Sequence, residues 1–104
     1  MKLIDIVPDA RVKLYDALIK KEDEIRSAGR GTFFRAGPSR KNSASWKHKA
    51  YPGRVDLARE SSGAVSARIK TAAHAREWQM MAAFLGFVDR HFGDKVSAIS
   101  IRYH

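Results

Sequence analysis

The chain has 104 residues, a net charge of +9 and no cysteine. This length predicts one domain over residues 1–104, and a content of 44% hydrophobic residues suffices for one core. The lack of cysteine excludes disulfides, thiolate metal sites and cysteine nucleophiles, and the apolar run in MKLIDIVPDAR is too short for a signal peptide or a membrane span. We therefore expect a cytoplasmic protein with no membrane contact.

The N-terminal third predicts an amphipathic helix, with a short strand before it as an option. Residues 1–7 alternate only in part, because apolar side chains occupy both sets of alternate positions. Pro8 and Asp9 are typical of a helix start. The helical stripe that follows consists of Ala10, Leu14, Ala17, Leu18 and Ile25. Gly29 or Gly31 ends this helix of about five turns.

From residue 32 the pattern changes to the period of two that is typical of strands. Residues 32–36 form a first short strand. The alternation of residues 46–59 is interrupted by Pro52 and Gly53, which predict a turn or a bulge. Residues 60–63 are typical of a hairpin turn, and residues 64–71 alternate apolar side chains with basic or hydroxyl ones. We expect an antiparallel hairpin with one buried face and one basic, solvated face.

The C-terminal third predicts a second helix over residues 75–92 and a final strand over residues 96–104. The main apolar stripe of this helix consists of Trp78, Met81, Ala82, Leu85, Val88 and Phe92. The element order, (β)-α-β-β-β-α-β, favours an α+β fold. We expect a two-layer sandwich, in which an antiparallel sheet of four or five strands has both helices on one face.

Two thirds of the excess positive charge lie in the middle of the chain. Residues 31–59 carry a net charge of +6, against +1 before them and +2 after them. A concentrated basic segment favours an anionic partner, either nucleic acid (RNA or DNA) or another anionic surface. The alternative is that the charge only keeps the protein soluble.

The candidate binding residues come from this basic segment and from the strand that pairs with it. Cations beside aromatic rings suit nucleic acid, because the cations contact phosphates while the rings stack on bases. Trp46 and Lys47 point to opposite faces of one strand, so Trp46 is expected in the core. Residues 37–45 have the composition of a mobile basic loop. The predicted anion-binding residues are Arg40, Lys41, Lys47, His48, Lys49, Tyr51, Arg54, Arg68 and Lys70. We therefore expect a small noncatalytic module that binds nucleic acid.

The histidines offer a weaker hypothesis, which is catalysis. His48, His74 and His91 show neither the spacing of metal ligands nor that of a catalytic motif. We expect no metal, no cofactor and no catalytic residue. If there is a reaction, His48 between two lysines, with Asp56 nearby, would act on a phosphate ester. A weak phosphodiester or phosphate-ester hydrolase is thus a third hypothesis.

The wide apolar face of the second helix supports a further alternative, a homodimer or an adaptor whose positive charge is incidental. Met80, Phe84 and Phe87 extend the main stripe and would form the interface. They are available for this only if the first helix does not cover them. An exposed terminal strand is the other route to a dimer.

Overall fold

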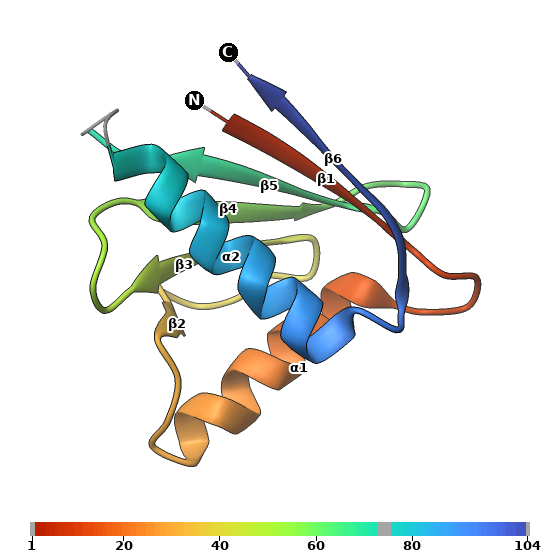
Figure 1. The fold of residues 1–104 in the computed structure, drawn as a ribbon. Coiled ribbons are helices and arrows are strands. Elements are labelled where there is room, and N and C mark those ends of the chain that lie inside the picture. Colours follow the sequence, from red (N-terminus) through yellow and green to blue (C-terminus); the bar gives the residue numbers. More distant parts are fainter. Residues whose placement is uncertain (1, 73–75, 104) are drawn as a thin grey trace.

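The computed structural model describes residues 2–72 and 76–103, which form two helices and six strands. In chain order the elements are β1 (Lys2–Pro8), α1 (Leu14–Ser27), β2 (Phe33–Arg35), β3 (Ser43–His48), β4 (Arg54–Arg59), β5 (Val65–Lys70), α2 (Glu77–Phe92) and β6 (Val96–Tyr103). All the strands join one antiparallel sheet in the order β2-β3-β4-β5-β1-β6 (Figure 1). The predicted α+β sandwich is confirmed, with six strands where four or five were expected.

The strand β1 lies inside the sheet, which explains its irregular sequence pattern. Ile4 pairs with Ala67 of β5 and with Ile101 of β6. Ile4 is buried on the helix side, and Leu3 is also buried although it points to the other side. Because both faces of this strand hold apolar residues, the alternation in residues 1–7 is incomplete.

Pro52 and Gly53 form a turn that separates β3 from β4, so residues 46–59 make two strands. Gly53 has a φ of +102°, which side chains other than glycine rarely adopt. A Cβ atom at this position would also overlap the carbonyl oxygen of Lys70. The turn therefore needs glycine, and it places the start of β4 beside the end of β5.

Helix α1 begins later than Pro8 and Asp9 predict. Pro8 is the last residue of β1 and pairs with Val96 of β6. Arg11 then has a φ of +73°, a left-handed conformation that a right-handed helix does not include. The helix consequently starts at Leu14. Its buried side consists of Leu14, Tyr15, Leu18 and Glu22.

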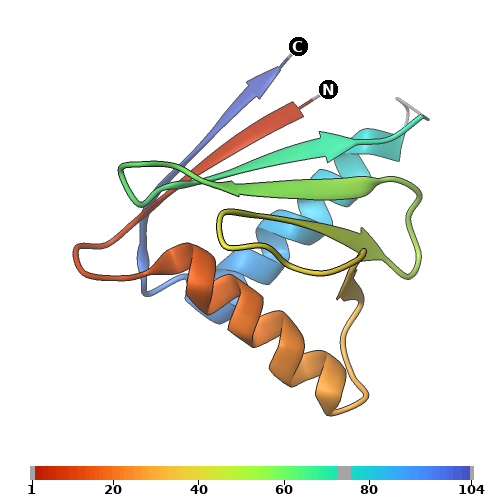
Figure 2. The same cartoon turned by 180° about the vertical axis from the view of Figure 1, so that it is seen from behind.

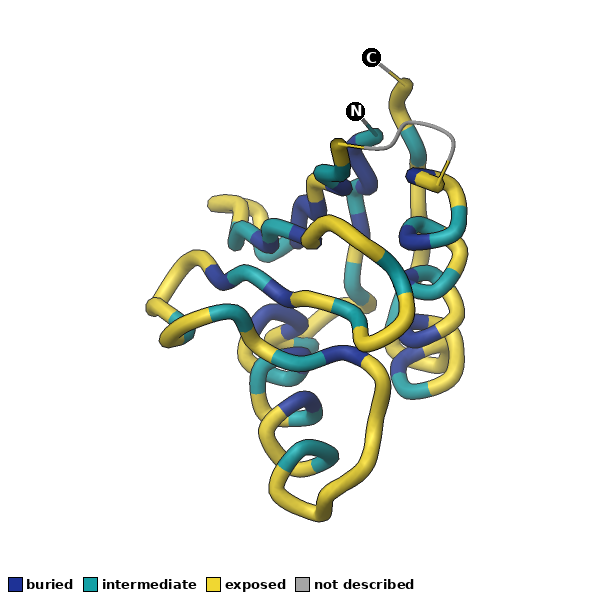
Figure 3. The backbone as a smooth tube through the Cα atoms, turned by 90° about the vertical axis from the view of Figure 1, so that its left-hand side faces the viewer, coloured by how far each residue is buried: buried dark blue, intermediate teal, exposed yellow. Residues whose placement is uncertain are grey.

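One hydrophobic core lies on one side of the sheet. The strands contribute Ile4, Ile6, Phe33, Ala44, Trp46, Val55, Leu57, Val65, Ala67 and Ile69. Helix α2 crosses this side of the sheet and α1 lies below it, next to β2 (Figures 1 and 2). Buried and exposed segments alternate along both helices (Figure 3). Neither of the described helices covers the opposite face.

The interface predicted on α2 is corrected, because the structure buries its three residues, Met80, Phe84 and Phe87. Both phenylalanine rings meet the rings of Phe33 and Trp46 at steep angles, with centroids 5.3 to 6.1 Å apart. Aromatic pairs prefer such edge-to-face geometry. Rings from the sheet therefore cover this side of α2 within one chain, and it is not available to a second subunit.

Candidate anion-binding surface

Four cations lie on β3, β4 and β5, on the face of the sheet that the helices leave uncovered. Side chains alternate along a strand, so the burial of Trp46, Val55 and Ile69 turns the residues next to them outward. The outward cations are Lys47 of β3, Arg54 of β4, and Arg68 and Lys70 of β5, here called the open basic face. Of the nine predicted binding residues, the structure brings these four together on one surface.

Asp56 is the acid at the centre of the open basic face. Its Oδ1 lies 3.0 Å from Nε of Arg54 and its Oδ2 lies 3.0 Å from Nζ of Lys70. The hydroxyl group of Ser45 donates a hydrogen bond to Oδ1 at 2.7 Å. Burial raises the pKa of Asp56, but these hydrogen bonds and the two positive charges outweigh burial and hold the pKa below its ordinary value. One negative charge is therefore shared by two cations.

Lys47 and Arg68 are the two cations of this face without such a counterion. Neither forms an ion pair with any residue of 2–72 or 76–103. Both side chains are exposed. They can therefore contact an external anion without first giving up a partner in the chain.

A pocket of about 660 Å³ opens at one end of the open basic face. It is lined by Lys47, His48, Tyr51, Pro52, Gly53, Arg54, Lys70, Thr71 and Ala72. This lining thus holds three cations of the open basic face and no acidic side chain. A phosphate group in this pocket would meet Lys47, Arg54 and Lys70 together.

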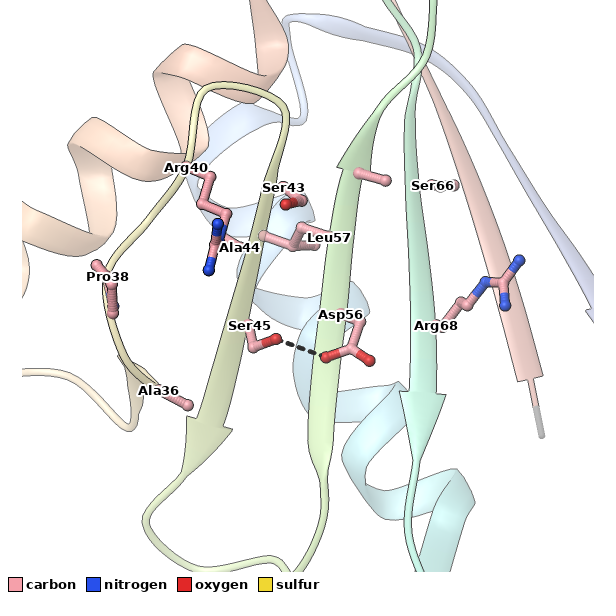
Figure 4. A pocket seen from close by; sticks show the side chains of 11 residues that line it. Ala36, Pro38, Arg40, Ser43, Ala44, Ser45, Asp56, Leu57, Ser66 and Arg68 are labelled. Atoms are coloured by element: carbon pink, nitrogen blue, oxygen red, sulfur yellow. Dashed lines mark hydrogen bonds between the residues drawn. The ribbon is translucent and has the colours of Figure 1, made fainter.

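A second hollow, of about 470 Å³, lies further along the same strands. Figure 4 shows Pro38 and Arg40 on one side of it, Ser45 and Asp56 on its floor, and Arg68 projecting away from Asp56. Most of the other lining side chains are small: Ala36, Ser43, Ala44, Ala58 and Ser66. Because its strand residues lie two positions from those of the pocket, the two hollows follow one another along the sheet. Together they form a track with Lys47, Arg54 and Lys70 at one end and small side chains, Arg40 and Arg68 at the other.

The remaining predicted cations lie away from this track or at its margin. Arg40 and Lys41 belong to the loop between β2 and β3, which is held at two points. The hydroxyl group of Tyr15 donates to the carbonyl oxygen of Arg40 at 2.7 Å, and Arg59 donates to that of Lys41 at 3.1 Å. Both cations also line a hollow shared with acids of α1. Lys49 follows β3 and is exposed. The mobility of the loop stays a prediction.

His48 is placed for packing, and the catalytic arrangement suggested for it is not formed. Its ring stacks on Tyr51 at 4.6 Å and meets the ring of Phe33 at 4.8 Å. The backbone N–H of Ala50 donates to its Nδ1 at 2.9 Å, and burial lowers the pKa of the ring. In β3, His48 follows Lys47, which points to the open face, so His48 points to the helix side of the sheet. Asp56 lies on the open face, so the side chains of His48 and Asp56 point to opposite sides. The stacking holds Tyr51 beside His48, and both rings line the pocket at the end of the open basic face.

Of the other histidines, the structure describes His91 alone. His74 lies outside the described residues. His91 contacts the ring of Phe87 at 4.6 Å, and burial together with the charges of Lys21 and Arg90 lowers its pKa. Within residues 2–72 and 76–103 no group of three or more metal-ligating side chains is present. Neither helix of the described chain is long and apolar enough to cross a bilayer.

Sequence reasoning missed Ser45 and Ser66, which lie beside Asp56 on the open face. The serine-rich composition of residues 37–45 favours a loop, whereas β3 begins at Ser43. The alternation of Ser43 and Ser45 with Ala44 and Trp46 is the signal that indicates a strand here.

No family model, no curated protein and no solved structure matches this chain.

Proposed function

We propose that this chain is a small noncatalytic module that binds nucleic acid through the open basic face. The observation that carries the proposal is the charge balance across β3, β4 and β5. Four cations point outward from these strands, and the acid among them is Asp56. A surface with such an excess attracts polyanions and releases their counterions on binding.

The same geometry favours contacts to phosphates over contacts to bases. Trp46 is fully buried, and one face of the Tyr51 ring is already covered by His48, so little aromatic surface is left for stacking on bases. Phosphate contacts fix the position of a nucleic acid but do not read its sequence. We therefore expect binding that depends steeply on salt and little on sequence.

Salt-titrated fluorescence anisotropy with labelled single-stranded and double-stranded oligonucleotides tests the proposal. We expect micromolar or tighter binding at about 50 mM salt and a large loss at about 200 mM salt. A triple variant, Lys47→Ala with Arg68→Ala and Lys70→Ala, should reduce the slope of log affinity against log salt by about 2 to 3. Arg54 is kept in this variant so that Asp56 retains one partner.

The matched control removes the same charge from the helix side of the molecule. Lys20, Arg30 and Arg90 are exposed there, so a variant with all three changed to alanine has the same net charge as the first. We expect it to keep most of the affinity and the slope. Equal losses in both variants, or no binding of the unchanged chain at the lower salt, would contradict the proposal.

Each of the other functional hypotheses requires a different surface or chemical group. Another anionic surface, such as an acidic protein, would compete for the same cations, and polyglutamate in the same assay distinguishes it from nucleic acid. A homo-oligomer or adaptor would need a surface other than Met80, Phe84 and Phe87. A hydrolase that used His48 as its base would need the Nδ1 atom that already accepts a hydrogen bond from Ala50.

A further inference from the structure

The strand β6 forms a long, unprotected edge of the sheet. It has eight residues, and in the part of the chain that the structure describes no segment lies beyond it (Figure 1). The opposite edge, β2, has only three residues. Natural sheets protect their edges with short strands, charged side chains or proline. The strand β6, with the sequence VSAISIRY, has no proline, and its one charge, Arg102, is paired with Asp5. The two edges of this sheet are therefore unequal, and β6 is the one open to another strand.

Exposed apolar side chains accompany this edge. Ile99 is 40% exposed and Tyr103 is 68% exposed, although both point to the helix side of the sheet. Lys2 lies between Tyr103 and α2: its Nζ is 5.4 Å from the centroid of the Tyr103 ring and 3.5 Å from Oε1 of Glu77. Trp78, the next residue of α2, is 57% exposed. The exposed surface of Ile99 and Tyr103 would shrink if another strand were added to β6.

We propose that the strand added to β6 is the β6 of a second copy of this chain. Two identical strands that pair antiparallel are related by a two-fold axis, so one surface satisfies both copies. The pairing would satisfy backbone groups on both edges at once. The one charged residue of β6, Arg102, is already paired with Asp5 at 2.9 Å, so the strand carries no unpaired charge into the pairing.

The side chains of β6 favour one register, in which the axis passes through Ser100. Ile99 of each copy then lies opposite Ile101 of the other, which gives two apolar cross-strand pairs on the helix side. On the open side Arg102 lies opposite Ala98, so like charges do not face each other. An axis at Ile99 would instead place Ile101 opposite Ser97. The register at Ser100 is therefore the better match.

This dimer does not depend on nucleic-acid binding, but it would change the affinity for long nucleic acids. A two-fold axis perpendicular to the sheet keeps the uncovered faces of both copies on the same side. The open basic faces would then be two parts of one continuous surface. A nucleic acid long enough to reach both would bind more tightly than one that reaches a single face, because the second contact is intramolecular.

The first test is the mass in solution, measured by light scattering from about 1 to about 200 µM protein. We expect the chain to approach twice its monomer mass as the concentration rises. Ile99→Lys places a charge on the edge and should raise the dissociation constant at least tenfold. Val7→Lys adds the same charge at an exposed site on β1, one strand from the edge, and should leave the dimer intact. A monomer at every concentration, or equal constants for both variants, overturns the proposal.

The second test does not depend on how Ile99→Lys folds. The chain has no cysteine, so a single introduced cysteine reports one distance. In the proposed register the two copies of residue 100 are direct neighbours, within the range that a disulfide spans. Ser100→Cys should therefore form a disulfide dimer on mild oxidation. In Ala98→Cys the two sulfurs would be about 13 Å apart and should not react. No cross-link in Ser100→Cys, or a faster one in Ala98→Cys, overturns the register.

Discussion

Arg54 and Lys70 lie directly opposite each other on β4 and β5, and both reach the carboxylate of Asp56. Like charges in such a cross-strand pair destabilise a sheet. Asp56 offsets this repulsion, but it also lowers the positive potential of the open basic face. Folding and phosphate binding therefore place opposite demands on this one residue.

The first prediction concerns both effects of Asp56. Asp56→Asn should lower the free energy of unfolding by about 1 kcal/mol. The loss is small because the ion pairs it breaks are partly exposed and the amide still fits beside Ser45. The same change should strengthen oligonucleotide binding about threefold or more at about 50 mM salt. Thermal unfolding and anisotropy measure the two effects on one preparation.

Asp5→Asn is the control for Asp56→Asn. It changes the net charge of the chain equally and breaks one ion pair on the same face of the sheet, to Arg102. Because Asp5 lies on β1, one strand beyond Arg68 and Lys70, and is paired with Arg102, binding should change less than in Asp56→Asn. If both variants gained the same affinity, the effect would come from total charge and not from this face.

The second prediction concerns pH and His48. Burial holds the pKa of His48 below its ordinary value of 6.5, so the unfolded chain takes up this proton first as the pH falls. Stability contributed by neutral His48 is thus present above 6.5 and is lost as the pH drops through 6.5 toward the lowered pKa. Between about pH 7.5 and 5.5 the stability difference between the unchanged chain and His48→Asn should shrink.

His91 serves as the internal control for this pH dependence. Its pKa is also lowered, but it titrates in both proteins and cancels in the difference. Urea unfolding at several pH values gives the two stabilities. A difference that stays constant or grows on acidification would mean that His48 is not held neutral by its contacts with Phe33 and Tyr51.

The third prediction contrasts two aromatic residues of α2. Phe84 is fully buried against Phe33 and Trp46, so Phe84→Ala should cost about 3 to 5 kcal/mol. Trp78→Ala, on the exposed side of the same helix, should change stability by about 0.5 kcal/mol or less. If Phe84→Ala does not fold, Phe84→Leu should show a smaller loss in the same direction. Equal midpoints of unfolding for Phe84→Ala and Trp78→Ala would contradict this burial.

Strand alternation predicted most of the fold, and helical spacing predicted the orientation of α2 less well. Apolar residues surround much of α2, so spacing alone favours a stripe that includes Trp78. The structure buries Met80 and Phe84 instead. The rings of Phe33 and Trp46 set this orientation, because they offer a surface against which Phe84 packs. Both residues lie far from α2 in the sequence. Tertiary contacts of this kind are not contained in a local pattern.

The candidate site, like the fold, could be predicted from the sequence only in part. The alternation of side chains along the strands was enough to place Lys47, Arg68 and Lys70 on an outward face. The contact between Ser45 and Asp56 was not predictable, because it depends on the register between β3 and β4. That register is set by the turn at Pro52 and Gly53, which the sequence leaves open between a turn and a bulge.

The place of β1 in the sheet also affects the order in which the protein can assemble. Each of β2, β3 and β4 pairs with the next strand in the chain, so their hydrogen bonds close short loops. The neighbours of β1 are β5 and β6. Lys2, near the start of the chain, pairs with Tyr103, near its end. Contacts between residues so distant in sequence slow folding, because a long loop must be ordered first. We therefore expect the four-stranded meander to form early and the insertion of β1 between β5 and β6 to limit the folding rate.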